Sequence, residues 1–146
     1  MPANPTQSQI EAISALIGTE AGGPLVMLNL NRYRERAKYD GPPPGGESPD
    51  VSGHEAYGRY SEKALARLAE IGGEVLWYTQ ATMTVIGDDS DVYDEVIAVR
   101  YPSAQAFIDL ALDPEIGVAL AHRTAGLERA ALIRCDEGMF NPLTKD

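Results

Sequence analysis

The sequence predicts an α+β fold, with one antiparallel four-stranded sheet and helices on one of its faces. Segments rich in β-branched and aromatic residues alternate with segments of helical periodicity, in the order strand, helix, strand, strand, helix, strand. Glycine pairs and prolines separate these segments. A strand–helix–strand unit that occurs twice is the split βαβ-βαβ, or ferredoxin-like, arrangement, in which the first and third strands lie in the middle.

The length of 146 residues fits one domain, which we assign to the whole chain, 1–146. Its core is expected over residues 25–135. An extra N-terminal helix and a linker precede it over 1–24, a loop rich in proline and glycine interrupts it at 40–50, and a tail follows over 136–146.

The chain is acidic, with 12 basic and 22 acidic residues and a net charge of -10. Such a charge repels phosphate backbones and anionic lipids, so we expect neither a nucleic acid nor a membrane as a partner. The single cysteine, Cys135, excludes an internal disulfide. The first residues do not have the form of a signal peptide and no apolar run is long enough to span a bilayer, so we expect a cytoplasmic protein.

The first strand, residues 25–33, is the segment around which the other elements are expected to assemble. Side chains alternate across a strand. We place one alternating set in the core under the helices and the other on the second face of the sheet. The core set is Val26, Leu28 and Leu30, and the second set is Met27, Asn29 and Asn31.

The remaining elements follow from periodicity, capping residues and breakers. Thr6 and Gln9 form a capping box for the N-terminal helix, which we expect to end at Gly18. The later helices begin after Ser52, Ser103 and the Asp113–Pro114 pair. The remaining predicted elements are a long helix over 53–71, strands over 74–86, 95–101 and 129–135, and a helix that ends at Gly126.

The sheet is expected to be apolar on both faces, whereas one copy of the chain brings helices for only one face. In the last strand, four apolar residues follow one another over 130–133 without alternation. A strand that is apolar on both sides is expected to be covered on both sides. The sequence therefore predicts a homodimer in which two sheets pack face to face.

Several short motifs resemble a known family. These are Val-Met-Leu-Asn-Leu at 26–30, Tyr39, Ser-Gly-His-Glu-Ala-Tyr-Gly-Arg-Tyr at 52–60, Arg-Tyr-Pro-Ser at 100–103, Asp-Pro at 113–114 and Arg123. Together they resemble domain-of-unknown-function family 1330 of the dimeric alpha-beta barrel superfamily. The resemblance implies a ferredoxin-like protomer and a sheet-to-sheet dimer, and it implies no activity. Relatives in the superfamily include cofactor-free monooxygenases, muconolactone isomerases, chlorite dismutases and haem-degrading enzymes, so the fold alone does not indicate a function.

Polar side chains on the predicted strands and helices are candidates for a small-molecule site. As catalytic residues we select Asn29 and Arg100, which would polarise the substrate, and Tyr60, which would move a proton. As substrate-binding residues we select Arg32, Tyr39, Tyr57, Trp77 and Arg123.

Each candidate also has a structural interpretation. The Asn29 amide could be hydrogen-bonded by the main chain, and Arg100 could form a structural ion pair. Arg32 could lie on a solvated extension of the strand. The tyrosines fit core positions with their hydroxyls at the rim, and Arg123 fits the negative end of a helix dipole.

Functions of different classes fit these residues. One is a cofactor-independent enzyme, similar to an isomerase or a monooxygenase, that acts on a small anionic or carbonyl metabolite. Another is a non-catalytic homodimer that binds a ligand in the same place, and a third is haem binding through His54 or His122, as in some superfamily relatives. A purely structural dimer would leave the polar candidates without a role. No pair among His54, His122 and Cys135 has metal-ligand spacing on one element, so we expect no metal and no cofactor.

Overall fold

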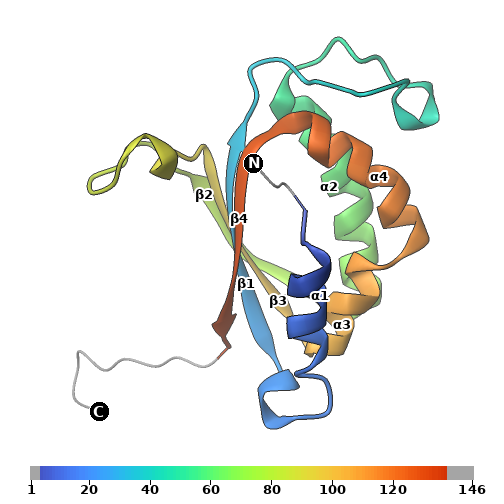
Figure 1. Cartoon of the computed structure of the whole chain (residues 1–146), viewed down its shortest axis with the longest axis vertical. Helices are drawn as coiled ribbons and strands as arrows, with labels where there is room; N and C mark the ends of the chain where they lie inside the picture. The colour runs from blue at the N-terminus through green and yellow to red at the C-terminus, as the bar shows by residue number, and fades with distance from the viewer. Residues whose placement is uncertain (1–3, 138–146) are drawn as a thin grey trace.

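The computed structural model describes residues 4–137 and contains the predicted sheet. The four strands are β1 (Leu25–Tyr33), β2 (Glu74–Gln80), β3 (Glu95–Tyr101) and β4 (Leu127–Asp136). They are antiparallel and lie in the order β2-β3-β1-β4, with β1 and β3 in the middle (Figure 1). This order confirms the predicted ferredoxin-like topology.

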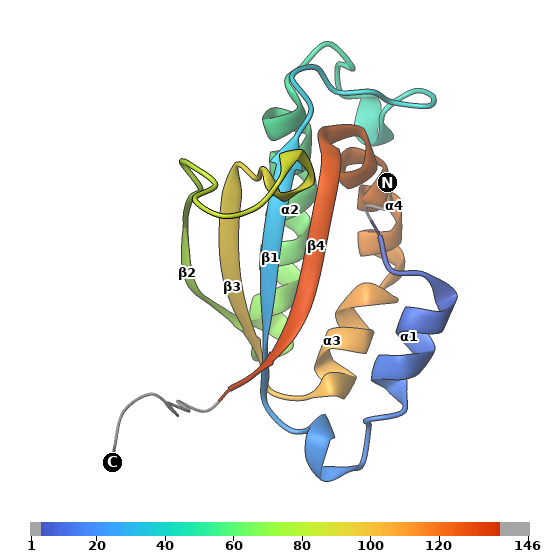
Figure 2. The same cartoon turned by 60° about the vertical axis from the view of Figure 1, so that its left-hand side comes forward.

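The helices all lie on one face of the sheet, as predicted (Figure 1). They are α1 (Gln7–Ser14), α2 (Gly53–Glu70), α3 (Ala104–Ala111) and α4 (Pro114–Gly126), and short 3-10 turns occur at Glu20–Gly22, Pro44–Gly46 and Asp89–Asp91. Figure 2 shows α1 beside α3, near the sheet edge formed by β4. The opposite face of the sheet carries no α-helix among the described residues, and the loop with the 3-10 turn Asp89–Asp91 crosses one end of it (Figure 2).

The predicted capping residues begin these helices. The Thr6 side chain accepts from the Gln9 backbone N–H, and the Gln9 side chain accepts from the Thr6 backbone N–H, which is a complete capping box. Ser52 and Ser103 cap α2 and α3, and Asp113 caps α4 with proline at the first helical position. The N-terminal helix is shorter than predicted, because regular α-helix stops at Ser14 and tight turns continue to Gly18.

The face of β1 that points toward the helices is the opposite of the one predicted. Leu25 and Met27 are buried against helix residues such as Phe107, and Asn31 is buried on the same face. The bare face carries the residues that we had placed in the core, Val26, Leu28 and Leu30. The prediction was wrong because alternation shows which side chains share a face, but β1 is apolar on both faces, so it does not show which face the helices cover.

Strand β2 is also shorter than predicted, and residues 81–94 form a loop. The segment after Gln80 contains β-prone residues, but no strand lies beside it to accept its hydrogen bonds. The loop is held instead by its own contacts, among them Thr84 Oγ1 to the Asp91 carbonyl oxygen and a capping box between Asp88 and Asp91. Met83, Val85 and Ile86 extend from it and are mostly exposed.

The bare face of the sheet carries a row of apolar side chains that crosses all four strands. Leu28 on β1 is opposite Ala98 on β3 and Ile133 on β4, and Ala98 is opposite Trp77 on β2. Trp77 and Ile133 are about half exposed. No helix among the described residues is both long and apolar enough to cross a bilayer.

Candidate functional site

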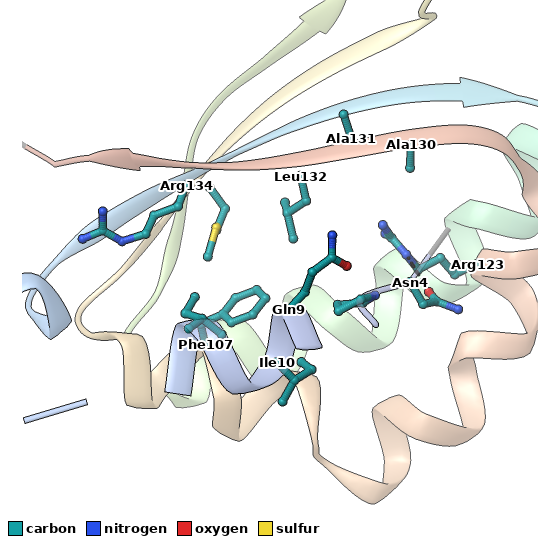
Figure 3. A pocket seen from close by; sticks show the side chains of 12 residues that line it. Asn4, Gln9, Ile10, Phe107, Arg123, Ala130, Ala131, Leu132 and Arg134 are labelled. Atoms are coloured by element: carbon teal, nitrogen blue, oxygen red, sulfur yellow. Dashed lines mark hydrogen bonds between the residues drawn. The ribbon is translucent and has the colours of Figure 1, made fainter. Parts of the chain in front are cut away.

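A cavity of about 400 Å³ lies between the sheet and the helices, beneath β4 (Figure 3). Ligand pockets in proteins have volumes of about 300–1,000 Å³. The N-terminal segment, β1, α3, α4 and β4 each contribute to its wall. The lining residues are Asn4, Pro5, Gln9, Ile10, Ile13, Met27, Phe107, Arg123, Ala130, Ala131, Leu132 and Arg134.

The alternation of β4 decides which of its side chains enter the cavity. Ala130 and Leu132 are opposite Asn31 and Asn29, whose side chains are on the helix side of β1. Figure 3 shows Ala130 and Leu132 directed into the cavity and Ala131 directed to the other side of the strand. The small Ala130 side chain leaves space where a larger one would fill it.

Arg123 is the most buried charged residue of the cavity wall, with 7% of its surface exposed. Its Nε donates to Asn4 Oδ1 at 3.1 Å, and Asn4 Nδ2 donates to Thr124 Oγ1 at 3.0 Å. The guanidinium carbon lies 5.3 Å from the centre of the Tyr60 ring and 5.8 Å from that of Tyr57. These distances are in the cation–π range, so the two rings fix the arginine from one side while the cavity borders it on another.

Arg134 lies at the opposite end of the cavity from Arg123 (Figure 3). It donates to the Ala21 carbonyl oxygen at 2.7 Å and pairs with Asp136 at 3.6 Å. Its Nε is buried and has no hydrogen-bond partner among the described residues, so this end of the cavity offers one unused donor.

A smaller cavity of about 80 Å³ lies beside the first, on the side of β2 and β3. Asn29, Tyr57 and Tyr60 line it, and Arg123 borders both cavities. The structure thus brings four of the predicted site residues together on the helix side of the sheet.

The surroundings of Asn29 and Tyr60 determine which hydrogen-bonding groups these two residues can offer to a ligand. Both N–H groups of Asn29 are directed to main-chain carbonyls, those of Met27 and Ile97, at 3.3 Å each. Asn29 therefore presents a carbonyl oxygen to a ligand instead of the N–H groups that would polarise a substrate carbonyl. Burial raises the pKa of the Tyr60 hydroxyl, and the charge of Arg123 opposes the rise only in part. Tyr60 is therefore a protonated phenol at neutral pH.

The other four predicted residues, Arg100, Arg32, Trp77 and Tyr39, lie away from this region. Arg100 is opposite Val26, so it is on the bare face, where its guanidinium pairs with Glu137 at 2.5 Å. Asn29 and Arg100 thus lie on opposite faces of the sheet and do not meet. Arg32 pairs with Glu128 at 3.2 Å, and Trp77 is on the bare face with Ala98.

Tyr39 has a partner that the sequence did not suggest. Its hydroxyl lies 2.6 Å from His122 Nδ1, and Arg59 donates to the same oxygen at 3.1 Å. Arg59 also donates to the Ser48 carbonyl oxygen, so this cluster fixes the proline- and glycine-rich loop to α2 and α4. Burial lowers the pKa of His122, and the charge of Arg59 lowers it further. A neutral imidazole accepts the Tyr39 hydrogen at Nδ1.

Most residues that form the larger cavity carry no functional signal in the sequence. Met27, Phe107 and Leu132 have the periodicity of ordinary core residues, and Asn4 lies on no predicted element. The predicted amphipathic N-terminal helix was the one indication, because its apolar face was expected to pack on the rest of the domain. Among the described residues, no group of three histidine, cysteine, aspartate or glutamate side chains is placed to hold a metal ion.

The fold and this site define an α+β, ferredoxin-like protein with a cavity between its layers. The family described as Domain of unknown function (DUF1330) matches residues 47–134, well over half of the chain. The protein belongs to this family, as the motifs had indicated.

Solved structures with a similar fold also carry no assigned function. The crystal structure of methylated RPA0582 protein is similar, with a TM-score of 0.80 and 32% identity over 98% of each chain. A second structure, of the RPA0582 protein of unknown function from Rhodopseudomonas palustris, has a TM-score of 0.80 and 31% identity over 94% of this chain and 97% of that one. No curated protein matches the chain.

Proposed function

We propose that the protein binds a small anionic or carbonyl-bearing metabolite in the cavity beneath β4. The observation that carries the proposal is the cavity itself, about 400 Å³ in the layer between sheet and helices. The cavity is partly open to solvent, so a ligand can enter it without separating the layers. A space of this size next to a buried arginine fits a bound molecule better than it fits core packing.

Binding has more support than catalysis. The described lining residues include no carboxylate, histidine or cysteine that would serve as a general base. Tyr60, our candidate for proton transfer, is a protonated phenol, and Arg100 lies on the other face. The polar groups that remain near the cavity bind and orient a molecule.

The test compares an alanine in the cavity wall with one outside it. We expect Ala130→Leu, which adds a larger side chain to the cavity, to weaken the binding of octan-1-ol and of octanoate by about tenfold or more, because their apolar bodies lose buried surface. Ala66→Leu makes the same change on the exposed surface of α2 and is expected to leave both affinities unchanged. Isothermal titration calorimetry measures each affinity.

Binding of neither probe to the unsubstituted protein would contradict the proposed function. Equal effects of the two substitutions would contradict the location of the site.

We also propose that two copies associate through the bare face of the sheet. Support comes from the row formed by Trp77, Ala98, Leu28 and Ile133, which is apolar across all four strands. Large apolar patches at the surface of a folded domain mark interaction sites. A second copy offers the same patch and satisfies both surfaces at once.

A matched pair of substitutions tests this association. Leu28→Asp puts a charge in the centre of the row and is expected to give a monomer at micromolar concentration. Leu112→Asp makes the same change at a position that is already 62% exposed after α3, and it is expected to leave the dimer intact. Sedimentation velocity measures the mass, and the single tryptophan, Trp77, reports burial through its emission wavelength. A monomeric unsubstituted protein would contradict this proposal.

A further inference from the structure

The cavity beneath β4 differs in charge from the rest of the protein. The chain carries 22 acidic and 12 basic residues. Nevertheless, the described lining residues include two arginines, Arg123 and Arg134, and no acidic side chain. The neutral polar residues of the wall, Asn4 and Gln9, carry amide N–H donors. A wall with positive charge and no described carboxylate favours a ligand that brings its own carboxylate.

The remainder of the cavity wall is apolar. Phe107 and Leu132 lie between the two arginines, and Ile10 of α1 lies on the side opposite the sheet (Figure 3). Met27 and Ile13 also line the cavity. A ligand that fills this space needs an apolar body, since an uncompensated polar group there would lose its hydrogen bonds to water.

We propose that the ligand is an amphipathic carboxylate, whose anionic group lies at Arg123 and whose apolar body extends toward Phe107. This assignment rests on the proposed function and specifies the ligand class. Arg123 is the better anchor because it is buried, and a charge pair is stronger away from water. A guanidinium attracts a carboxylate through its charge and through charge-assisted hydrogen bonds.

The Asn4 side chain completes the end of the cavity that binds the carboxylate. Its oxygen holds Arg123 Nε at 3.1 Å, which orients the guanidinium. Its amide nitrogen carries two hydrogens, of which one is directed to Thr124 Oγ1. A carboxylate at Arg123 lies within reach of the same amide group, so both residues serve as donors to it.

Octanoate and octan-1-ol test the assignment because they share an apolar chain and differ in charge. We expect octanoate to bind about tenfold more tightly, the advantage of a hydrogen-bonded charged group over a neutral one. Arg123→Met is expected to reduce octanoate affinity to the level of octan-1-ol. Arg100→Met removes an arginine from the bare face and is expected to change neither affinity.

A second variant covers the case in which loss of Arg123 disturbs the packing against Tyr57 and Tyr60. Gln9→Glu keeps the capping box, because glutamate serves at this position as well as glutamine. It adds a negative charge to the exposed part of the cavity wall. We expect it to weaken octanoate binding severalfold and to leave octan-1-ol binding unchanged.

The outcomes separate this assignment from the proposed function. If both probes bind equally and Gln9→Glu affects neither, the cavity binds small molecules but the carboxylate assignment is overturned. The site is on the other face if octanoate binds more tightly than octan-1-ol and this difference is lost in Arg100→Met but kept in Arg123→Met. If neither probe binds, the proposed function itself fails.

Discussion

His122 is a buried histidine that stabilises the fold through a hydrogen bond with Tyr39. The residue is 6% exposed, and its ring meets the Tyr39 ring edge-on at 5.6 Å, in addition to the short hydrogen bond. Burial and the charge of Arg59 both disfavour the imidazolium, while Glu47 opposes them weakly, so the pKa of His122 is lower in the folded protein. Protonation of Nδ1 would require the Tyr39 hydroxyl to accept this hydrogen bond instead of donating it.

The pH dependence of stability follows from this shift. The unfolded chain binds a proton at His122 near pH 6.5, the ordinary value, and the folded protein binds it only at lower pH. The stabilising contribution is therefore complete above pH 6.5 and is lost as the pH falls through the folded pKa. Urea unfolding between pH 7.5 and 5 should show a smaller loss of stability in His122→Gln, which keeps a polar side chain that does not titrate. Identical pH profiles for the two proteins would contradict this interpretation.

At the residue scale the sequence predicted a cluster that is partly correct. Tyr57, Tyr60 and Arg123 do meet, because each lies on a helix face whose direction follows from its periodicity. Asn29 and Arg100 do not meet, because they lie on opposite faces of the sheet. Which residues of two neighbouring strands share a face depends on the register of the strands, and the sequence does not show that register. The backbone contacts of Asn29 were among the predicted alternatives, and the structure shows them.

At the scale of elements, two glycines determine how closely the start of α2 approaches the end of α4. Gly53 N–H donates to the Arg34 carbonyl oxygen at 3.0 Å, and Arg34 N–H donates to the Gly126 carbonyl oxygen at 2.8 Å. A Cβ atom at Gly53 would lie 2.2 Å from the Arg34 oxygen and 2.6 Å from the Gly126 oxygen. Both contacts are with main-chain atoms, so relief requires the segments to separate.

A substitution on α2 and its control follow from this contact. Gly53→Ala should destabilise the protein by about 1–3 kcal/mol or more, because the added methyl group forces apart two main-chain segments. Gly58→Ala, on the exposed side of the same helix with no atom within 4 Å of the new Cβ, should stabilise it by about 0.5–1 kcal/mol. Urea denaturation of the two variants measures the difference. Similar stabilities would show that the contact is looser than these distances indicate.

The element order and most helix boundaries could be predicted because capping residues and breakers are local signals. Ser52, Ser103 and the Asp113–Pro114 pair start helices where expected. The end of β2 could not be predicted in this way, because a strand continues only where a neighbouring strand accepts its hydrogen bonds. Neither Thr84 nor Val85 indicates whether such a neighbour is present.

At the scale of the whole molecule, the two faces of one sheet have different roles in this account. The helix side contains the cavity and the buried arginine, while the bare side carries the apolar row that we assign to a second copy. The sequence predicted both layers and a small-molecule site, but not the residues that form most of the larger cavity. The cavity depends on contacts such as that of Asn4 with Arg123, two residues that are 119 positions apart in the sequence. Periodicity and capping residues describe only neighbouring positions, so they do not predict such a contact.

The location of a bound molecule tests the central claim most directly. Met27 lines the cavity, whereas Met83 is 78% exposed on the loop over 81–94. In protein labelled with carbon-13 at the methionine methyl groups, octanoate or octan-1-ol should shift the Met27 resonance in proportion to occupancy and leave the Met83 resonance in place. A Met27 resonance that neither probe moves, or a shift confined to Met83, would contradict a small-molecule site between the sheet and its helices.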